Sequence, residues 1–211
     1  YTVKNRSRTY VNKILNKVSG EHYKNYKINL IKRYKENIEI FYGEKNEFFI
    51  YDKVVIATHA DEALSILEKP TDEEKNLLSN FKYKNNLAVI HTDKNQMPRN
   101  KKAWSAWNAK LSKNVRENSS VTYWLNLLQN LKFDEDIFLS LNPFDKIDEQ
   151  KILKKVMFTH PYYDKLALEN QAKLKKIQNV NNTLFCGSYF GYGFHEDGIT
   201  SSIDMLNSIN D

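Results

Sequence analysis

The C-terminal stretch, residues 182–209, is the feature that most constrains how this chain can fold. Its apolar run ending at Cys186 predicts a short buried strand, and a helix is expected to start near Asp197. An aromatic loop lies between them, and four of the chain's six glycines fall between positions 187 and 198. A strand, a glycine-rich turn and a helix N-terminus together suit an anion or a cofactor. A glycine-rich turn with ordinary packing aromatics is an equally good interpretation.

The predicted C-terminal helix carries an apolar stripe. Four of its residues recur at helical spacing and share one side: Ile199, Ile203, Leu206 and Ile209.

Composition and charge narrow the class of protein. At 211 residues the chain can form one large domain or two small ones with a real core. It has no apolar run of about 18 residues, so no transmembrane helix is expected. The net charge is +6, with lysines spread along the chain, and only 94–113 is locally basic, around Trp104 and Trp107. We expect no nucleic-acid binding, and peripheral contact with a membrane surface or an acidic ligand stays open.

The single cysteine, Cys186, excludes an internal disulfide and predicts a reducing compartment, so a cytoplasmic location is expected. We expect a small buried side chain there rather than a catalytic thiol. The chain starts at Tyr1 without a charged and apolar leader, so no signal peptide is expected. It looks like a piece cut from a longer protein.

Periodicity predicts the elements before the C-terminal stretch. A helix is expected from Ser7, as N-cap, to Val18, with Gly20 as its stop. Alternating residues predict an antiparallel meander at 26–31, 38–42 and 47–51. The continuous apolar run 53–58 predicts a strand buried on both faces.

The rest of the chain alternates helices and strands. After 53–58 a helix is expected over 61–67, and the capping box at Thr71 opens another. Further strands are predicted at 86–92, 104–108, 120–125, 137–141 and 151–159. A polar turn is expected at 112–119, the chain should turn at His160–Pro161, and a helix is expected over 164–177.

No metal centre is expected from the five histidines. His22, His59, His91, His160 and His195 show no helical pairing, and His195 with Asp197 is their only carboxylate pair at ligand spacing. Hydrolase and phosphate-loop motifs are absent as well.

Seven segments carry a more specific pattern: 54–61, 89–93, 97–99, 103–108, 122–126, 141–143 and 185–198. In this order, over nearly the whole chain, they resemble the bacterial FAD-dependent, amine-oxidase-like oxidoreductases. These belong to the superfamily of monoamine oxidase, protoporphyrinogen oxidase and phytoene desaturase. The resemblance implies an α+β fold: a mainly antiparallel substrate-domain sheet with helices, flanked by partial β/α elements of a split, Rossmann-like FAD-binding domain.

The resemblance also implies a division into domains. Residues 1–79 would be a partial FAD-domain segment, 80–163 a substrate domain, and 164–211 the returning FAD-domain strand and helix. The superfamily's N-terminal Gly-x-Gly-x-x-Gly has no match here. The chain is therefore similar to the C-terminal part of such an enzyme. The missing N-terminal half would be its partner, and we expect this chain alone to bind little or no FAD and to be inactive.

Particular residues take implied roles. Seven would contact the cofactor in the complete enzyme: Ala57, Thr58, Gly187, Ser188, Phe194, Gly198 and Ile199. Of these, Gly198 and Ile199 would aim helix-terminal amides at the flavin. Ordinary packing is the alternative for the glycines and for Phe194.

Substrate contact and catalysis are less defined. Trp104, Trp107, Tyr123 and Trp124 could line a pocket for an apolar or lipid-like small molecule, or could be core residues. His59, His91 and His195 are weak candidates for a catalytic base. The competing function is a non-catalytic module that binds a lipid or an anionic ligand.

Overall fold

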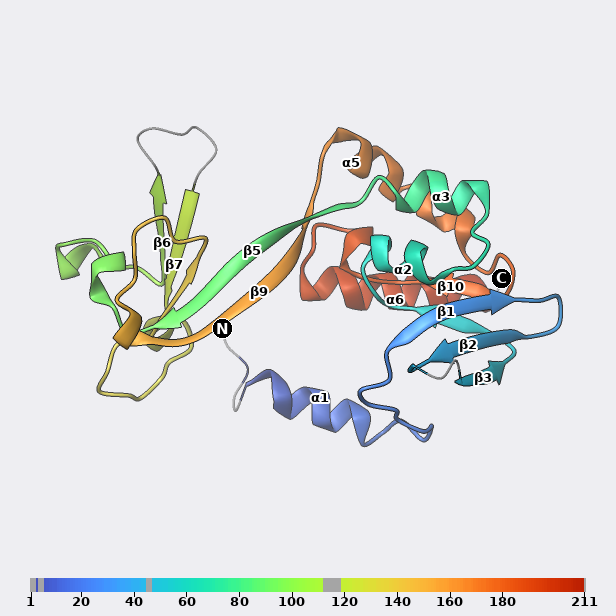
Figure 1. The fold of residues 1–211 in the computed structure, drawn as a ribbon, viewed down its shortest axis with the longest axis horizontal. Coiled ribbons are helices and arrows are strands. Elements are labelled where there is room, and N and C mark those ends of the chain that lie inside the picture. Colours follow the sequence, from blue (N-terminus) through green and yellow to red (C-terminus); the bar gives the residue numbers. More distant parts are fainter. Residues whose placement is uncertain (1–2, 4–5, 45–46, 112–118, 211) are drawn as a thin grey trace. The chain divides into compact units, whose positions relative to one another are not determined.

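The structure is a computed structural model that describes residues 3, 6–44, 47–111 and 119–210. About 33% helix and 31% strand make it an α+β protein, which confirms the predicted fold class. Contacts divide the chain into two compact units. We call residues 1–21 with 85–160 the sheet unit, and residues 22–84 with 161–211 the mixed unit (Figure 1). The functional labels of the three predicted domain ranges stay a prediction.

The mixed unit begins with the predicted meander. Strands β1 (Ile28–Arg33), β2 (Ile38–Tyr42) and β3 (Glu47–Tyr51) pair antiparallel in chain order. Ile31 and Ile38 are buried, whereas the other end of this sheet is aromatic, with the rings of Tyr42 and Phe49 stacked at 4.7 Å.

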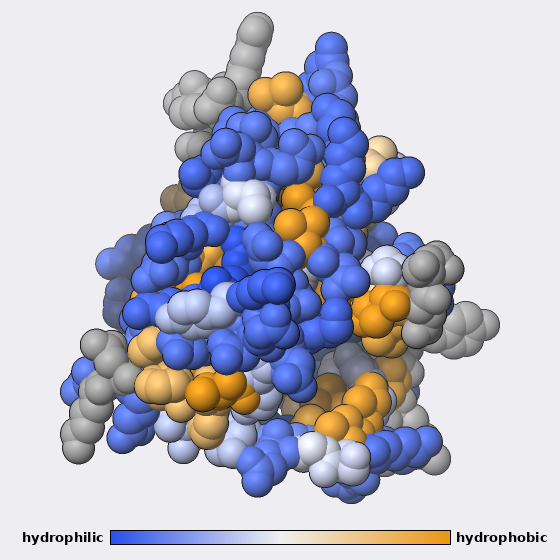
Figure 2. All heavy atoms as spheres, turned by 90° about the vertical axis from the view of Figure 1, so that its right-hand side faces the viewer, coloured by the Kyte–Doolittle hydropathy of each residue, from blue (hydrophilic) through white to orange (hydrophobic). Residues whose placement is uncertain are grey.

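On the face of the molecule drawn in Figure 2, hydrophobic residues form separate patches between hydrophilic ones.

A parallel pair of strands follows the meander. Strand β4 (Val54–Ile56) pairs with β10 (Thr183–Phe185), with Thr183 opposite Val54 and Phe185 opposite Ile56. Both strands were predicted. The expectation that β4 is buried on both faces is wrong, because Val55 is 47% exposed between two buried neighbours. Among the described residues β4 pairs with no strand other than β10.

Helices α2 (Ala60–Ile66) and α3 (Asp72–Leu78) come next. The predicted capping box at Thr71 is confirmed: the Glu74 amide donates to the Thr71 hydroxyl at 3.1 Å, and the Thr71 amide donates to the Glu74 carboxylate at 2.6 Å. Buried apolar side chains from both helices join the core of this unit. Its members are Ile31, Ile38, Val54, Ile56, Ala60, Ala63, Leu67, Leu77, Leu78, Phe81, Ala167, Leu174, Ile177, Phe185 and Tyr189.

One ion pair is buried beside this core. The guanidinium of Arg33 meets the Glu74 carboxylate through two bonds of 2.5 and 2.9 Å, and the two side chains are 5% and 0% exposed. Arg33 also donates to the Lys69 carbonyl at 2.7 Å. The pair therefore ties β1 to α3 inside the protein.

The predicted helix over 164–177 is two helices. α5 (Lys165–Gln171) is capped by Asp164, whose carboxylate accepts from the Ala167 amide at 3.0 Å, and a short 3₁₀ helix η4 (Leu174–Ile177) follows. The Lys173 amide bonds to the Asn170 carbonyl, three residues back, which tightens the helix end into the 3₁₀ pattern.

The last helix, α6 (His195–Asn210), follows the 3₁₀ turn η5 (Ser188–Phe190). The buried side chains of α6 are those of Ser201 and Met205. The predicted apolar stripe points the other way, since Ile199, Ile203 and Leu206 are 56%, 53% and 54% exposed. An apolar stripe on a surface helix ordinarily faces the core, so this helix has its faces reversed.

The sheet unit is built on five strands in the order β6-β7-β8-β5-β9. Short helices α4 (Leu125–Leu128), η1 (Lys94–Gln96), η2 (Lys101–Ala103) and η3 (Glu149–Lys151) connect them. The strands are β5 (Lys82–His91), β6 (Trp107–Leu111), β7 (Ser119–Trp124), β8 (Phe138–Leu141) and β9 (Ile152–Tyr162). The predicted turn at 112–119 lies almost entirely outside the described residues.

Two local predictions in this unit are wrong. Strand β9 continues through His160 and Pro161 instead of turning there. Helix α1 (Ser7–Leu15) starts one residue early and ends before Gly20: its N-cap is Arg6, at φ +68°, rather than Ser7.

Candidate functional site

The carboxyl ends of β4 and β10 bring four of the predicted cofactor residues together. Because the two strands are parallel, the segments that follow them leave the sheet at the same end, the carboxyl end. A Cβ at Gly187 would lie 3.5 Å from the Thr58 carbonyl, and one at Gly198 would lie 3.9 Å from the Ser188 amide. We call Thr58, Gly187, Ser188 and Gly198 the strand-end cluster.

Gly187 is held tightly within this cluster. Its amide donates to the Ser201 hydroxyl of α6 at 3.0 Å. Its φ is +155°, and a Cβ there would meet the Tyr189 ring at 2.9 Å. A glycine is therefore required at this position by backbone and packing, whether or not a ligand binds.

Asp197 organises the glycine-rich loop, and sequence reasoning gave it no such role. Its carboxylate accepts from the Tyr192 amide at 3.0 Å and from the Phe194 amide at 2.8 Å. The space where a Gly191 side chain would stand is filled by Asp197. Gly193 has φ +92° and lies against Tyr163. Packing therefore explains Gly191 and Gly193, as the ordinary interpretation of the loop predicted. An acidic residue in the first turn of a helix was the available signal.

The start of α6 differs from the prediction. The helix begins at His195, two residues before the expected start, and the Gly198 amide donates to the Phe194 carbonyl at 3.3 Å. The amides without an intrahelical acceptor are thus those of the first turn before Gly198. Phe194 is 70% exposed, and His195, at the helix start, is exposed as well.

His59 directly follows Thr58 at the carboxyl end of β4 and is the N-cap of α2. Its ring stacks on Tyr83 at 4.2 Å with an interplanar angle of 13°. The Tyr83 hydroxyl accepts from the Ala60 amide at 2.9 Å, and burial raises the pKa of Tyr83 to about 12. Ala57, between β4 and His59, is exposed. His59 is therefore positioned by ring stacking at a helix end.

Tyr189 is the buried aromatic behind the strand-end cluster. Its ring packs against Phe81 at 5.2 Å and Phe190 at 4.8 Å, and the residue is 2% exposed. Its hydroxyl is buried without a hydrogen-bond partner among the described residues. Burial raises the pKa of Tyr189, so the phenol stays protonated.

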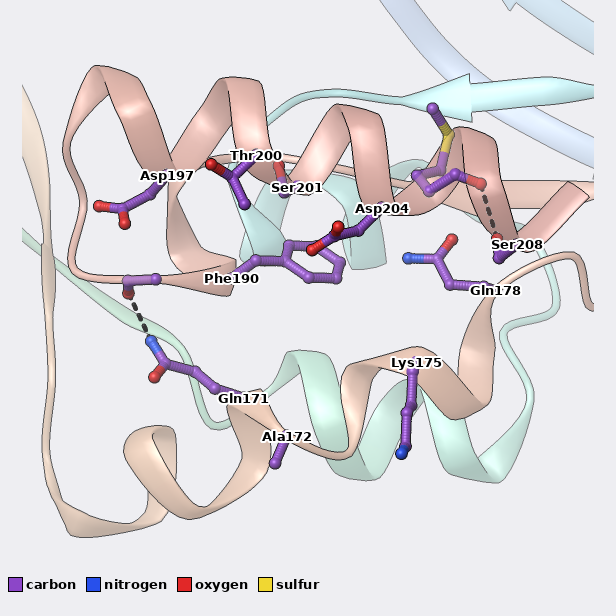
Figure 3. Close-up of a pocket in the computed structure, with 12 residues that line it drawn as sticks. Gln171, Ala172, Lys175, Gln178, Phe190, Asp197, Thr200, Ser201, Asp204 and Ser208 are labelled. Carbon is purple, nitrogen blue, oxygen red and sulfur yellow. Dashed lines mark hydrogen bonds between the residues drawn. The ribbon is translucent and has the colours of Figure 1, made fainter.

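A cavity of about 290 Å³ lies between α6 and the α5–η4 segment (Figure 3). Figure 3 shows Thr200 and Asp204 extending from α6 toward it, with the Phe190 ring inside. The Gln171 amide donates to the carbonyls of Tyr189 and Gly191 and so braces the glycine-rich loop. None of the predicted cofactor residues lines this cavity.

In the sheet unit, His91 is part of a buried polar network. It is 0% exposed, its Nδ1 accepts from the Asp93 amide at 3.1 Å, and its Nε2 therefore donates to the Ser140 hydroxyl at 2.8 Å. Ser140 in turn lies 2.7 Å from the Thr122 hydroxyl. Burial lowers the pKa of His91. The imidazole links β5 to β8, and Ser140 carries the network on to β7. The ring has no exposed surface at which to meet a substrate.

The four predicted pocket aromatics divide between the two faces of this sheet. Trp104 packs edge-on against Trp124 at 5.3 Å and against the buried Phe138 at 5.6 Å. Trp107 packs against its cross-strand partner Tyr123 at 5.1 Å. Alternation along β7 puts Tyr123 and Trp124 on opposite faces. The structure therefore brings together two pairs rather than one group of four.

The face that carries Trp107 and Tyr123 is apolar and only partly covered. Register fixes its members, since Tyr123 pairs with Leu139 and Leu139 pairs with Ile90. We call this the open face. Its residues are Ala88, Ile90, Trp107, Ala109, Leu111, Ser119, Val121, Tyr123, Leu139 and Leu141.

The described residues contain neither a candidate metal site nor a candidate membrane-spanning helix. No group of three or more histidine, cysteine, aspartate or glutamate side chains there could hold a metal ion. None of the helices in that part of the chain is both long and apolar enough to cross a bilayer.

The parallel pair has one closed edge and one open edge. On the outer side of β10, the Gln178 side chain donates to the Phe185 carbonyl and accepts from its amide, at 2.8 and 3.0 Å. On β4, the Val54 amide and the Ile56 carbonyl bond toward β10, so the backbone groups of Val55 point to the opposite edge. That edge therefore presents unpaired backbone groups, whereas the reversed stripe of α6 presents apolar side chains.

Comparisons with known proteins give a consistent fold. No family model and no curated protein matches the sequence. Among solved structures, a fatty acid isomerase from P. acnes that produces CLA matches with a TM-score of 0.66 and 14% identity, covering 96% of this chain and 51% of that one. A double mutant of putrescine oxidase matches with a TM-score of 0.62 and 8% identity, covering 96% and 53%.

Cyclohexylamine oxidase from Brevibacterium oxydans IH-35A is also similar, with a TM-score of 0.54 and 11% identity, covering 88% of this chain and 49% of that one. The chain spans about half the length of each of these proteins. The chain therefore has the fold of about half of each of these proteins.

Proposed function

We propose that this chain is the part of an FAD-dependent oxidoreductase that covers the flavin and binds an apolar amine or lipid-like substrate. The strand-end cluster is the observation that supports the proposal most directly. In open parallel sheets, ligands bind at the carboxyl ends of the strands. When bound, FAD would accept a hydride from the substrate, while the protein supplies orientation and electrostatics.

The residues present fit such a ligand. Small residues leave the backbone accessible: Ala57 follows β4, Gly187 follows β10, and Gly198 faces the Ser188 amide. The first-turn amides of α6 stand beside them and offer a positive dipole end. The role of these residues is to let a large planar ligand approach the backbone and to hold it by amide groups.

The open face supports the substrate part of the proposal. It presents branched aliphatic and aromatic side chains on strands whose other face is already packed around the His91 network. An apolar chain or ring would bury these side chains and gain by leaving water. Tyr123, which is packed edge to face against Trp107, would be the aromatic contact.

Cofactor binding by this chain alone is expected to be weak. The 211 residues contain no Gly-x-Gly-x-x-Gly to hold the pyrophosphate. The open edge of β4 and the exposed stripe of α6 are surfaces on which a further parallel strand and its helix would complete the sheet. Hydrogen exchange at the Val55 amide tests this: it should be fast in the chain and at least about tenfold slower once a nucleotide-binding segment is present.

Gly198→Ala separates a cofactor role from a packing role. A Cβ 3.9 Å from the Ser188 amide makes ordinary contact, and alanine favours the helix over glycine, so the chain should fold and be more stable by about 0.5–1 kcal/mol. In protein that carries a nucleotide-binding segment, the same methyl group should weaken FAD binding by about tenfold or more, because it narrows the ligand's approach to the backbone. Gly20→Ala is the matched control, since no atom lies within 4 Å of that position.

Flavin retention after desalting is the measurement. The chain alone should come off the column colourless after incubation with FAD. Protein with the nucleotide-binding segment should retain a flavin absorbance band. If that longer protein takes up no FAD, the enzyme proposal is overturned, and if the chain alone retains FAD at full occupancy, its assignment as half a site is overturned.

The substrate class is tested on the open face. Leu139→Asn places a polar group in the middle of that face and should raise KM for long-chain amines or fatty acids more than it changes kcat. Leu166→Asn, at an exposed position on α5, is the control. Equal KM values for the two variants would contradict substrate binding on this face.

A further inference from the structure

Strand β6 ends the five-stranded sheet and exposes two large apolar side chains. Trp107 is 63% exposed and Leu111 is 76% exposed, and both project from the same face of the strand. The Trp107 indole is braced by Tyr123 at 5.1 Å, so it is held in place while its surface faces water. Side chains of this size on a sheet edge are costly to leave in water and typically mark a contact surface.

Cations gather on the segment that leads into this strand. Lys94 and Lys101 share one carboxylate, that of Asp136, at 3.2 and 3.6 Å, and Lys110 pairs with Asp145. Arg99 and Lys102 form no ion pair within the described part of the chain. Five cations therefore meet two carboxylates, which leaves three positive charges in excess. These cations are Lys94, Arg99, Lys101, Lys102 and Lys110.

A recess opens among these cations. Its volume is about 830 Å³. The Trp104 indole donates to the Pro98 carbonyl at 2.8 Å and so fixes the wall of the recess. Lys110 lines it from β6, on the side of the strand opposite Trp107. The edge of β6 therefore has apolar groups on one flank and a basic recess on the other. The lining residues used here are Lys94, Met97, Arg99, Trp104, Asn108 and Lys110.

We propose that this edge, residues 94–111, docks on the surface of an anionic lipid bilayer. Trp107 and Leu111 enter the boundary between headgroups and acyl chains, and the recess with Arg99 takes an anionic headgroup. Tryptophan is suited to that boundary, and lysine and arginine are attracted to anionic lipid. An anionic bilayer offers an apolar interior and a negative surface together, so it can bind both the apolar side chains and the cations of this edge.

A soluble anion or a nucleic acid fits the same surface less well. A soluble anion would use the cations but leave Trp107 and Leu111 in water. Single-stranded nucleic acid would need aromatic faces in the basic region for stacking. Of the two tryptophans in this region, Trp104 is packed edge-on against Trp124 and Phe138. Trp107 is exposed, but it projects from the side of β6 opposite Lys110 and does not line the basic recess. The surface thus complements a bilayer in charge and in polarity.

The test is sedimentation of the intact 211-residue chain with vesicles. The chain should bind vesicles of phosphatidylcholine with phosphatidylglycerol, should not bind phosphatidylcholine alone, and should be released by high salt. The emission of Trp107 should shift to shorter wavelength on binding, and Trp107→Phe should remove that shift. Equal binding to both kinds of vesicle would overturn the proposal.

Charge reversal supplies the matched control. Arg99→Glu with Lys102→Glu should weaken vesicle binding by about tenfold or more. Lys13→Glu with Lys17→Glu, at exposed positions of α1 and its end, makes the same change in net charge and should weaken it far less. All four positions are exposed, and thermal unfolding is the check that the variants fold. Equal weakening by the two pairs would show attraction by net charge alone and would overturn the proposal.

Two further arms separate the apolar and headgroup contributions. Leu111→Ser should reduce binding to anionic vesicles and leave its salt dependence unchanged, because it removes apolar contact only. Inorganic phosphate is the soluble probe. If phosphate binds the chain and competes fully while Leu111→Ser has no effect, the surface is a site for soluble anions and the bilayer proposal fails.

Discussion

The two units of this chain bury different kinds of side chain. The core of the mixed unit is aliphatic and aromatic, and its buried charges are confined to the Arg33–Glu74 pair. In the sheet unit, the buried polar residues His91, Asp93, Gln96, Ser120, Thr122 and Ser140 outnumber the buried apolar ones, Ala88, Val89, Met97, Phe138 and Ile147. Apolar packing therefore determines the first unit, and directional hydrogen bonds determine much of the second.

This difference has a functional side. A sheet whose packed face is fixed by hydrogen bonds can leave its other face apolar and available, which is the arrangement of the open face. The mixed unit instead has a closed core and leaves backbone groups at a strand edge and apolar side chains along one helix. The first surface suits a small apolar ligand, and the second suits another piece of chain.

Breaking the buried ion pair is the largest expected perturbation. Glu74→Gln removes the carboxylate charge and leaves the Arg33 guanidinium buried without a counter-charge. The free energy of unfolding should fall by about 3–5 kcal/mol. Denaturant unfolding followed by circular dichroism measures the loss. Glu73→Gln, one residue away and exposed, should change stability by less than about 0.5 kcal/mol. A small loss for Glu74→Gln would show that the mixed unit does not depend on the pair.

The polar network of the sheet unit should respond next. Ser140→Ala removes the acceptor of the His91 Nε2–H and the neighbour of the Thr122 hydroxyl. Leaving a buried donor unsatisfied costs about 1–3 kcal/mol. The control is Ser119→Ala, on the same sheet but exposed. Matching stabilities for the two variants would mean that hydrogen bonds do not determine this unit.

The same network predicts a pH dependence. Burial lowers the pKa of His91 below its ordinary value of 6.5, so the folded protein holds the ring neutral. Above pH 6.5 the ring is neutral in both states, and its contribution to stability is complete. As pH falls below 6.5 the unfolded chain takes up a proton first, so stability is lost until the folded-state pKa is reached. Unfolding curves across this range should show the loss, and His91→Gln should reduce it. An unchanged pH profile in His91→Gln would assign the loss to other groups.

Sequence reasoning predicted the local elements well where one pattern decided them. The alternation in 26–51 predicted the meander, and the Thr71 to Glu74 spacing predicted the capping box that the structure shows. Both depend on residues close in sequence. The resemblance predicted the fold because it drew on segments in a fixed order along the whole chain.

The errors came from partners distant in sequence. Val55 is predicted to be buried because a continuous apolar run is typical of a strand covered on both faces, but its side chain lies on a face that leaves it 47% exposed. The apolar stripe of α6 is predicted to face the core, yet Ser201 and Met205 are the side chains that pack inward. Asp197 was missed as the loop's acceptor because its role depends on a turn whose shape the sequence does not reveal. Trp104 and Trp107 pack on different faces of the sheet because β6 begins only at Trp107.

A partly buried tyrosine, Tyr83, and a buried one, Tyr189, give a comparison with smaller expected effects inside the mixed unit. The Tyr83 hydroxyl accepts from the Ala60 amide, whereas the Tyr189 hydroxyl has no partner in the part of the chain that the structure describes. Tyr83→Phe should therefore lower the free energy of unfolding by about 1 kcal/mol, and Tyr189→Phe should leave it unchanged or raise it by a similar amount. Thermal unfolding of both variants is the measurement, and destabilisation by Tyr189→Phe would reveal a partner for its hydroxyl.

The smallest expected effect is on the reversed helix face. Ile203 is 53% exposed, so Ile203→Ser should change the stability of this chain by less than about 0.5 kcal/mol. Met205→Ser, on the buried side of α6, should cost about 2–5 kcal/mol, as for other large-to-small core substitutions. If a nucleotide-binding segment covers the stripe, Ile203→Ser should become costly in protein that carries the segment, and the difference between the two backgrounds measures the contact. A substitution that is harmless in both would show that the stripe faces water in the complete protein, and the open edge of β4 would then have to accept its strand without the helix.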